Sequence, residues 1–310
     1  MLILFNLFKL TMNNIKSTFS IKDLENLTGV KAHTIRIWEK RYNLLQPERT
    51  DTNIRYYSLV NLQKLLNISY LNSNGYKISK IASLSGNEIP ELVKEVAKND
   101  HTNNHAIDTF KLSMLNFDQK LFYDTYETLI NEKSFLDMFY EDFIPLLSEI
   151  GMLWQTDTIS PAHEHFLTSL IRQKILINTE KLQSQNQEKT DKVFVLYLPD
   201  NEVHELALMI INYQVIANGH KSIFLGQSVP LESLKDLLDY YDDITFISYF
   251  TVKPDKEHIA DYVKEFSDKI LIKKSIKLWV LGRMLQELDL NTLPKQITAF
   301  DSIEDLVKKL

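Results

Sequence analysis

The stretch from residue 19 to residue 57 constrains the fold of this chain more than any other. It reads FSIKDLENLTGVKAHTIRIWEKRYNLLQPERTDTNIRYY. Ser20 can cap a first helix, because Asp23 follows three residues later in the capping-box position. Gly29 stands where the turn between two helices needs a residue that tolerates positive φ. The pattern predicts helix, tight turn, helix, and then a basic loop.

The second helix of this stretch carries two different faces. Ile35, Trp38 and Tyr42 recur at helical spacing and predict an apolar, packed face. Arg36 and Lys40, four residues apart, lie on another face, where they can reach phosphates or base edges. The basic loop beyond the helix favours the same kind of partner.

That loop has the pattern of a β-hairpin. Arg49 and Arg55 flank Asn53, which we expect at the hairpin tip. The alternative interpretation is a helical packing module whose charges form only a solvated face. Because turn, helix and hairpin signals agree, we favour a winged helix-turn-helix.

These residues resemble the MerR family of winged helix-turn-helix regulators. The resemblance extends to about residue 84 and rests on four runs, LTGV at 27–30, TIR at 34–36, PER at 47–49 and IRYY at 54–57. The run RIWEKRY at 36–42 is similar to the variant in light-responsive, cobalamin-binding regulators of the CarH/LitR type. The resemblance implies double-stranded promoter DNA as the partner. The DNA contacts that it implies are Lys31, His33, Thr34, Arg36, Lys40, Arg41, Arg49, Arg55 and Tyr56.

The charge distribution supports a nucleic-acid partner only for the N-terminal part. The whole chain has a formal net charge of −6. Residues 18–90 hold ten Lys and Arg against six Asp and Glu, a net charge of +4, and residues 1–17 add +2. Residues 91–310 therefore carry −12. A basic module on an acidic body favours local attraction to phosphates.

The absence of cysteine and the character of the first residues bear on location. Without cysteine, disulfides, thiolate metal sites and cysteine nucleophiles are excluded. Met1–Leu10 is apolar, but it is shorter than the roughly 20 residues that a membrane span needs. It also lacks the pattern of a signal peptide. We predict a disordered leader over residues 1–17, no membrane partner and a cytoplasmic location. The favoured interpretation of Met1–Leu10 is an upstream start, with Met12 opening the polar leader, and a membrane-touching tail is the less favoured one.

Three domains follow from the remaining pattern. Residues 18–100 form the predicted DNA-binding domain. Residues 105–185 read as a four-helix bundle, with periodic segments Ile107–Leu115, Asp118–Asn131 and Phe135–Leu153 and a fourth helix that starts at Pro161 after the cap Ser160. Residues 192–310 alternate between strands and helices. This alternation predicts a flavodoxin-like, doubly wound parallel sheet, so the fold class is multidomain α and α/β. Its expected elements are strands 193–198, 222–226, 244–249, 276–281 and 297–300, and helices 203–217, 231–240, 255–267 and 302–309.

A candidate ligand site follows the first strand of this sheet. Ligands of open parallel sheets bind beyond the carboxyl ends of the strands. His204 stands there as a candidate metal ligand, and Glu202 can accept the other imidazole proton. The alternative is that His204 makes only a polar contact at a helix start.

The run EVHELA at 202–207, then Gly219 and LGQSVP at 225–230, resembles the cobalamin-binding domain of corrinoid proteins. The resemblance implies that His204 binds cobalt from below, with Glu202 holding its imidazole, and that Ser248 meets the nucleotide tail. Trp154, followed ten residues later by Glu164-His165, resembles the bundle of CarH-type photoreceptors. There, the tryptophan covers adenosylcobalamin and the Glu-His pair lies near the adenosyl group. The cofactor contacts implied are Trp154, Glu164, His165, Glu202, His204, Gly226, Ser228, Ser248 and Gly282, with His204 as the metal ligand.

Three departures from the family pattern keep a second hypothesis open. Ala207 replaces a glycine, Leu281-Gly282 replaces a pair of glycines, and Gln155 replaces a histidine that captures cobalt after photolysis. The leading prediction is a transcriptional repressor, not an enzyme, that forms a dimer or tetramer and senses adenosylcobalamin and light. The alternative is a cobalamin-independent MerR-type regulator that uses residues 105–310 only for oligomerisation or partner binding. A corrinoid methyltransferase subunit is disfavoured, because it has no use for residues 19–57.

Overall fold

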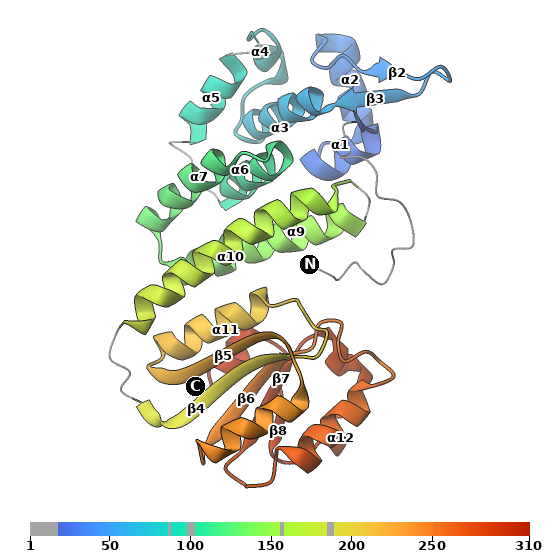
Figure 1. Ribbon diagram of the computed structural model, residues 1–310. Coiled ribbons are helices and arrows are strands. Elements are labelled where there is room, and N and C mark those ends of the chain that lie inside the picture. The colour runs from blue at the N-terminus through green and yellow to red at the C-terminus, as the bar shows by residue number, and fades with distance from the viewer. Residues whose placement is uncertain (1–17, 86–87, 98–102, 156–157, 185–188) are drawn as a thin grey trace. The chain divides into compact units, whose positions relative to one another are not determined.

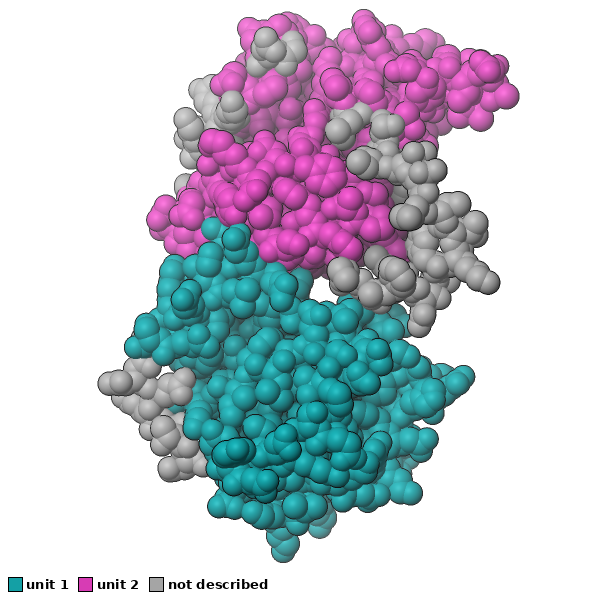
Figure 2. All heavy atoms as spheres, in the orientation of Figure 1, with its two compact units in different colours: residues 1–11, 172–310 teal, residues 12–171 magenta. Residues whose placement is uncertain are grey.

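The computed structural model describes residues 18–85, 88–97, 103–155, 158–184 and 189–310 (Figure 1). The predicted leader, residues 1–17, lies outside the described residues. The described chain forms two compact units that divide within one long helix, residues up to 171 and residues 172–310 (Figure 2). None of the helices in the described ranges combines the length and apolar character that crossing a bilayer requires.

The N-terminal unit, magenta in Figure 2, begins with the predicted winged helix-turn-helix. Its helices are α1 (Ile21–Thr28) and α2 (Ala32–Tyr42), and its strands are β1 (Thr18–Phe19), β2 (Glu48–Arg49) and β3 (Arg55–Ser58). The three strands pair in the order β1-β3-β2.

The local signals of this module are confirmed. The backbone N–H of Asp23 donates to Ser20 Oγ at 3.2 Å, and the N–H of Ser20 donates to Asp23 Oδ2 at 2.7 Å. Gly29 has φ 71° and Asn53 has φ 63°, at the helix turn and the hairpin tip respectively. The capping box, the turn and the wing therefore follow directly from short-range sequence chemistry.

Three more helices complete this module, α3 (Leu59–Ser73), α4 (Ile78–Ala82) and α5 (Glu88–Ala97). Ser58 caps α3, because its Oγ accepts a hydrogen bond from the backbone N–H of Asn61 at 3.3 Å. Leu24 of α1, Ile35 of α2 and Leu62 of α3 are completely buried. This shared core fixes the orientation of α2 within the module.

The helical region contains α6 (Asn103–Asn116), α7 (Gln119–Glu132), α8 (Phe135–Met138), α9 (Ile144–Gln155) and α10 (Pro161–Gln183). Aromatic side chains fill its core. The ring centroid of Phe110 lies 5.0 Å from that of Phe122 and 5.4 Å from that of Phe143. The helical character predicted for this region is therefore present in the structure.

The predicted single helix over residues 135–153 is interrupted. A π-helical turn, Phe139–Phe143, separates α8 from α9, and the N–H of Ile144 donates to the carbonyl of Phe139. Pro145 follows immediately and has no N–H to donate to the carbonyl four residues back. The wider turn accommodates this missing bond, which periodicity alone does not reveal.

The C-terminal unit, teal in Figure 2, contains a five-stranded parallel sheet with the order β5-β4-β6-β7-β8. Its strands are β4 (Lys189–Pro199), β5 (His220–Val229), β6 (Ile244–Tyr249), β7 (Lys277–Leu281) and β8 (Ile297–Ala299). Numbered within the domain, this order is 2-1-3-4-5, as in flavodoxin-like folds. The predicted fold class is confirmed, and the point where the strand order reverses lies beside β4.

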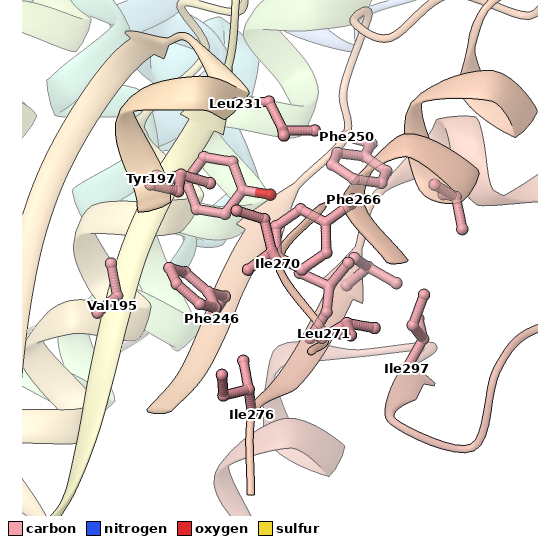
Figure 3. Close-up of a cluster of buried hydrophobic side chains, with 14 of the residues drawn as sticks. Val195, Tyr197, Leu231, Phe246, Phe250, Phe266, Ile270, Leu271, Ile276 and Ile297 are labelled. Carbon is pink, nitrogen blue, oxygen red and sulfur yellow. The ribbon is translucent and has the colours of Figure 1, made fainter. Parts of the chain in front are cut away.

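Helices cover both faces of this sheet. One face packs against α11 (Leu206–Ala217) and α13 (Ile303–Val307), through Leu208, Ile211 and Leu306. The other packs against the 3₁₀ helix η3 (Leu231–Asp239) and α12 (Ile259–Lys269), where Phe246 and Phe266 meet in the cluster shown in Figure 3. Short 3₁₀ segments η4 (Arg283–Glu287) and η5 (Leu290–Thr292) lie between β7 and β8.

Three of the predicted helices of this domain differ from the structure in type or by more than two residues at their start. The helix predicted over 255–267 begins only at Ile259 and ends at Lys269. The helix predicted over 203–217 begins only at Leu206, so residues 200–205 form a loop at the sheet edge. The segment predicted as helix 231–240 is a 3₁₀ helix. The later start of α11 matters for function, because it leaves His204 on a loop.

Gly282, at the end of β7, has a conformation that other residues rarely adopt, with φ 112°. A Cβ atom at this position would lie 2.4 Å from the backbone carbonyl oxygen of Phe250. The glycine is therefore required by the close approach of the protein's own backbone.

We expect Gly282→Ala to lower the free energy of unfolding by about 3 kcal/mol or more, because backbone strain and a backbone clash add. Gly219→Ala is the matched control. It also has positive φ, 77°, but no atom lies within 4 Å of its Cβ position. Its cost should stay near 1–2 kcal/mol. Urea unfolding of both variants measures the difference, and equal losses would contradict the steric argument.

Candidate functional sites

The first candidate site is the exposed face of α2. His33, Arg36, Lys40 and Arg41 are all exposed, whereas Ile35 and Trp38 of the same helix are buried. The predicted division of α2 into an apolar and a basic face is thus present. The basic face is suited to the phosphates and base edges of a DNA groove.

The wing places two further predicted residues opposite one another. Arg49 of β2 pairs in register with Arg55 of β3. Facing like charges destabilise an antiparallel pair. Arg49 donates to Asn53 Oδ1 at 2.7 Å, and Arg55 Nε lies 3.4 Å from Glu39 Oε2. Each arginine of the wing therefore has a partner within the module, Asn53 for Arg49 and Glu39 for Arg55.

Glu39 connects α2 to the wing, a role that sequence reasoning missed. Its Oε2 faces Arg55, and its Oε1 accepts a hydrogen bond from the Tyr57 hydroxyl at 2.5 Å. Burial of Tyr57 and its bond to Glu39 raise the pKa of that hydroxyl. No local pattern could have revealed this contact, because Glu39 and Tyr57 are eighteen residues apart.

The remaining predicted DNA contacts differ from one another in exposure and in the partners of their side chains. Lys31 is exposed and donates to Glu25 Oε1 at 3.2 Å, and Thr34 is half-buried. The Arg41 guanidinium lies 5.4 Å from the centre of the Tyr42 ring. Tyr56 donates its hydroxyl to Glu48 at 2.7 Å on the surface of the wing. The structure brings Arg36, Lys40 and His33 together on α2 and places the others around them.

The second candidate site is the carboxyl edge of the sheet. His204 lies on the loop between β4 and α11, with 12% of its side chain exposed, and its Nδ1 is hydrogen-bonded to Glu202 Oε1. Glu202 therefore sets the imidazole tautomer, as expected. Coordination of a metal from this position would use the other ring nitrogen, Nε2.

Glu202 also holds the loop that follows β6. Its Oε2 accepts hydrogen bonds from the backbone N–H groups of Val252 and Lys253, at 2.7 and 2.8 Å. Its Oε1 accepts from the N–H groups of Val203 and His204, at 2.9 and 3.1 Å. Burial acts to raise the pKa of Glu202, but the bonds from His204 and the backbone outweigh it and lower that pKa to about 2. The carboxylate is therefore ionised and links two loops of the edge.

Four other predicted cofactor contacts lie at the same edge. Ser228 (φ 50°) accepts from the N–H of Asn201 at 3.0 Å and donates to Asp200 at 2.9 Å. Ser248 is fully buried and donates to the carbonyl of Tyr197 at 2.9 Å. Gly226 lies on β5 and Gly282 follows β7. Ser228 thus shapes the loop that carries His204.

The predicted bundle residues form a separate group. Trp154 lies near the end of α9 and is half-buried. On α10, Glu164 Oε2 lies 3.3 Å from His165 Nε2, and this oxygen is buried with no hydrogen-bond partner among the described residues. His163, by contrast, is packed. Its Nδ1 lies 2.9 Å from Ser160 Oγ, and its ring stacks on Phe117 at 4.7 Å. Burial lowers the pKa of His163 despite its bond to the carbonyl of Leu115.

These donors fit cobalamin. A corrin ring supplies most of the cobalt ligands itself, so one protein imidazole suffices. The described residues contain no group of three or more His, Cys, Asp or Glu side chains that could hold a metal ion. His204 offers an imidazole with a carboxylate behind it, and the buried Glu164 oxygen can accept a hydrogen bond from a sugar hydroxyl.

Comparison with known proteins assigns the N-terminal module. Residues 19–86 match the family described as MerR HTH family regulatory protein. The N-terminal module is therefore of the MerR helix-turn-helix type. Residues 106–177 match a second family, described as B12 binding domain.

Individual proteins resemble larger parts of this chain. The HTH-type transcriptional repressor CarH of Myxococcus xanthus is 29% identical over 226 residues, covering 70% of this chain and 73% of CarH. The repressor CarA of the same organism is 21% identical over 246 residues, 77% of this chain and 79% of CarA. The monomethylamine corrinoid protein of Methanosarcina barkeri shares the fold over 67% of this chain and 98% of its own, with a TM-score of 0.55 and 12% identity.

The contacts of Glu202 yield a prediction about stability without any cofactor. Glu202→Ala should lower the free energy of unfolding by about 3 kcal/mol or more, because four backbone N–H groups and an imidazole lose their acceptor. His204→Ala is the control. It leaves Glu202 with its four backbone donors and should cost roughly half as much or less. Denaturant unfolding of the cofactor-free protein tests this. Equal losses of stability in the two variants would mean that Glu202 stabilises the protein only through its bond to His204.

Proposed function

We propose that this protein is a MerR-type transcriptional repressor that binds promoter DNA and responds to adenosylcobalamin and light. The observation that carries the proposal is the presence, in one chain, of a basic helix-and-wing face and a carboxylate-held imidazole at a sheet edge. The relatives CarH and CarA, named as transcriptional repressors, support it. We infer that the protein is a regulator and not an enzyme, because its proposed partner is DNA. We infer a cytoplasmic location for the same reason.

In the proposed complex, α2 lies in the major groove and the wing meets the backbone or the minor groove. Arg36 and Lys40 are exposed on the groove-facing side of α2. Glu39 holds Arg55 at the base of the wing, so the two elements would present their charges as one surface. We propose that Lys31, His33, Thr34, Arg41, Arg49 and Tyr56 complete the contact area.

Arg36→Ala should weaken binding to the protein's own promoter by roughly 1–3 kcal/mol if Arg36 reads a base. Wild-type affinity should fall steeply with salt, because phosphate contacts release counterions. Fluorescence anisotropy at several salt concentrations, with promoter and random duplexes, measures both. Lys120→Ala is the control, since Lys120 is an exposed lysine of α7. Equal wild-type affinity for both duplexes would refute the regulator.

For the cofactor, we propose that the imidazole of His204 would coordinate cobalt and that Glu202 would keep this imidazole oriented. Trp154 would shield the cofactor from water, while Glu164 and His165 would hold the adenosyl group by hydrogen bonds. Gly226, Ser228, Ser248 and Gly282 would line the path of the nucleotide tail. When bound, adenosylcobalamin supplies a cobalt–carbon bond that light cleaves.

His204→Ala should abolish or greatly weaken cobalamin uptake, measured by absorbance in the dark and after gel filtration. His258→Ala is the matched control, because His258 is an exposed histidine of the same unit that pairs with Asp255. Uptake by His204→Ala at the wild-type level would remove His204 from the site. We also expect the dark, adenosyl-loaded protein to elute as a dimer or tetramer and to shift to a smaller size after illumination.

A second candidate function has one observation in its favour. A Cβ atom at Gly282 would lie 2.4 Å from the carbonyl oxygen of Phe250, so the protein's own backbone accounts for this glycine without a ligand. A cobalamin-independent regulator would use residues 105–310 for oligomerisation or partner binding. Absorbance of the protein mixed with adenosylcobalamin in the dark separates the two.

A further inference from the structure

The exposed stripe of α2 contains one side chain without charge or hydrogen-bonding groups. Ile37 is 52% exposed, whereas Ile35, two residues earlier, is completely buried. Its neighbours on the stripe, at helical spacing, are His33, Arg36, Lys40 and Arg41, all exposed. Ile37 therefore lies at the centre of a cationic surface.

Exposure of a single isoleucine is common and proves nothing alone. The position is what matters here. A β-branched residue has a lower helix propensity than lysine, arginine or leucine, and an exposed one recovers little of that loss by packing. The surrounding cations also disfavour an apolar protein partner and favour a polyanion. An isoleucine in this place is best explained by an apolar group on that polyanion.

The major groove of DNA offers one such group. Guanine, adenine and cytosine present hydrogen-bonding atoms at their major-groove edges, whereas thymine adds a C5-methyl group. Isoleucine has no donor or acceptor and can distinguish bases only through this methyl. We propose that Ile37 reads the C5-methyl group of a thymine in each half of the operator, an inference that rests on the proposed DNA-binding function.

The wing carries a second exposed isoleucine that serves as an internal comparison. Ile54 is 63% exposed beside the hairpin tip, and its backbone N–H and carbonyl both bond to Thr50. A wing meets the backbone or the minor groove, where no thymine methyl is displayed. Ile54 can add contact area there, but it cannot sense the methyl group.

The experiment uses the full-length protein and a duplex enriched by selection from random DNA. Each thymine of the enriched site is replaced in turn by deoxyuridine, which removes the methyl group and keeps base pairing. Wild-type Kd should rise roughly 3- to 10-fold at one thymine position per half-site, as expected for one buried methyl group. Ile37→Ala should bind the thymine and deoxyuridine duplexes equally. The difference between the two ratios isolates the contact.

Three further variants sharpen the result. Ile37→Val keeps a branched side chain and should retain most of the deoxyuridine effect. Ile54→Ala should keep the full effect, whatever its overall affinity. Ile272→Ala, an isoleucine of the sheet unit that is 62% exposed, should behave as wild type.

Selective wild-type binding with no deoxyuridine effect would overturn this inference alone. The same holds if Ile37→Ala retains the full effect. If the selection enriches no site, the proposed DNA-binding function fails and this inference fails with it. The outcomes for the two proposals are therefore distinguishable.

Discussion

The buried carboxylate of Glu202 is the interaction on which the sheet-edge site depends. A single ionised side chain, 1% exposed, satisfies two N–H groups of its own loop, two of the loop after β6, and the imidazole of His204. A charge can remain buried only when hydrogen bonds replace its lost hydration. The loops must therefore keep their positions for the buried charge to be tolerated. His204 is held in place as well, because its imidazole is hydrogen-bonded to the same carboxylate. The geometry of a candidate cobalt ligand is thus set by backbone groups fifty residues away.

In the DNA-binding module another carboxylate, Glu39, organises its neighbours in the same way, although its partners differ. Glu39 is a poorly exposed carboxylate that receives the Tyr57 hydroxyl and faces Arg55. It neutralises one of two arginines that would otherwise repel each other across β2 and β3. In both units a buried or poorly exposed carboxylate organises side chains for which we propose a contact with the partner. Substitutions of such residues change function through geometry, which separates them from substitutions of contact residues.

The separation in sequence between two contacting residues explains which contacts could be predicted. Contacts that span only a few residues can be recognised from the sequence, as at Ser20, Gly29, Asn53 and Ser58. The sheet order followed from alternating strands and helices, which leave few topologies. The bonds from Glu202 to Val252 and from Glu39 to Tyr57 are long-range and leave no periodic signal. The start of α11 at Leu206 was missed for a related reason, because residues 200–205 are held by Ser228 and Glu202 from outside the segment.

The π-helical turn at Phe139–Phe143 also determines the phase of the helix that follows. Each residue of an α-helix advances the side-chain direction by about 100°. One additional residue accommodated in the turn therefore rotates every later side chain of α9 relative to α8 by about that angle. Trp154 owes the direction in which its indole points to an irregularity more than ten residues upstream. Inserting or deleting one residue in this turn would therefore rotate all the side chains of α9 by about 100°, with no change in the sequence of α9 itself.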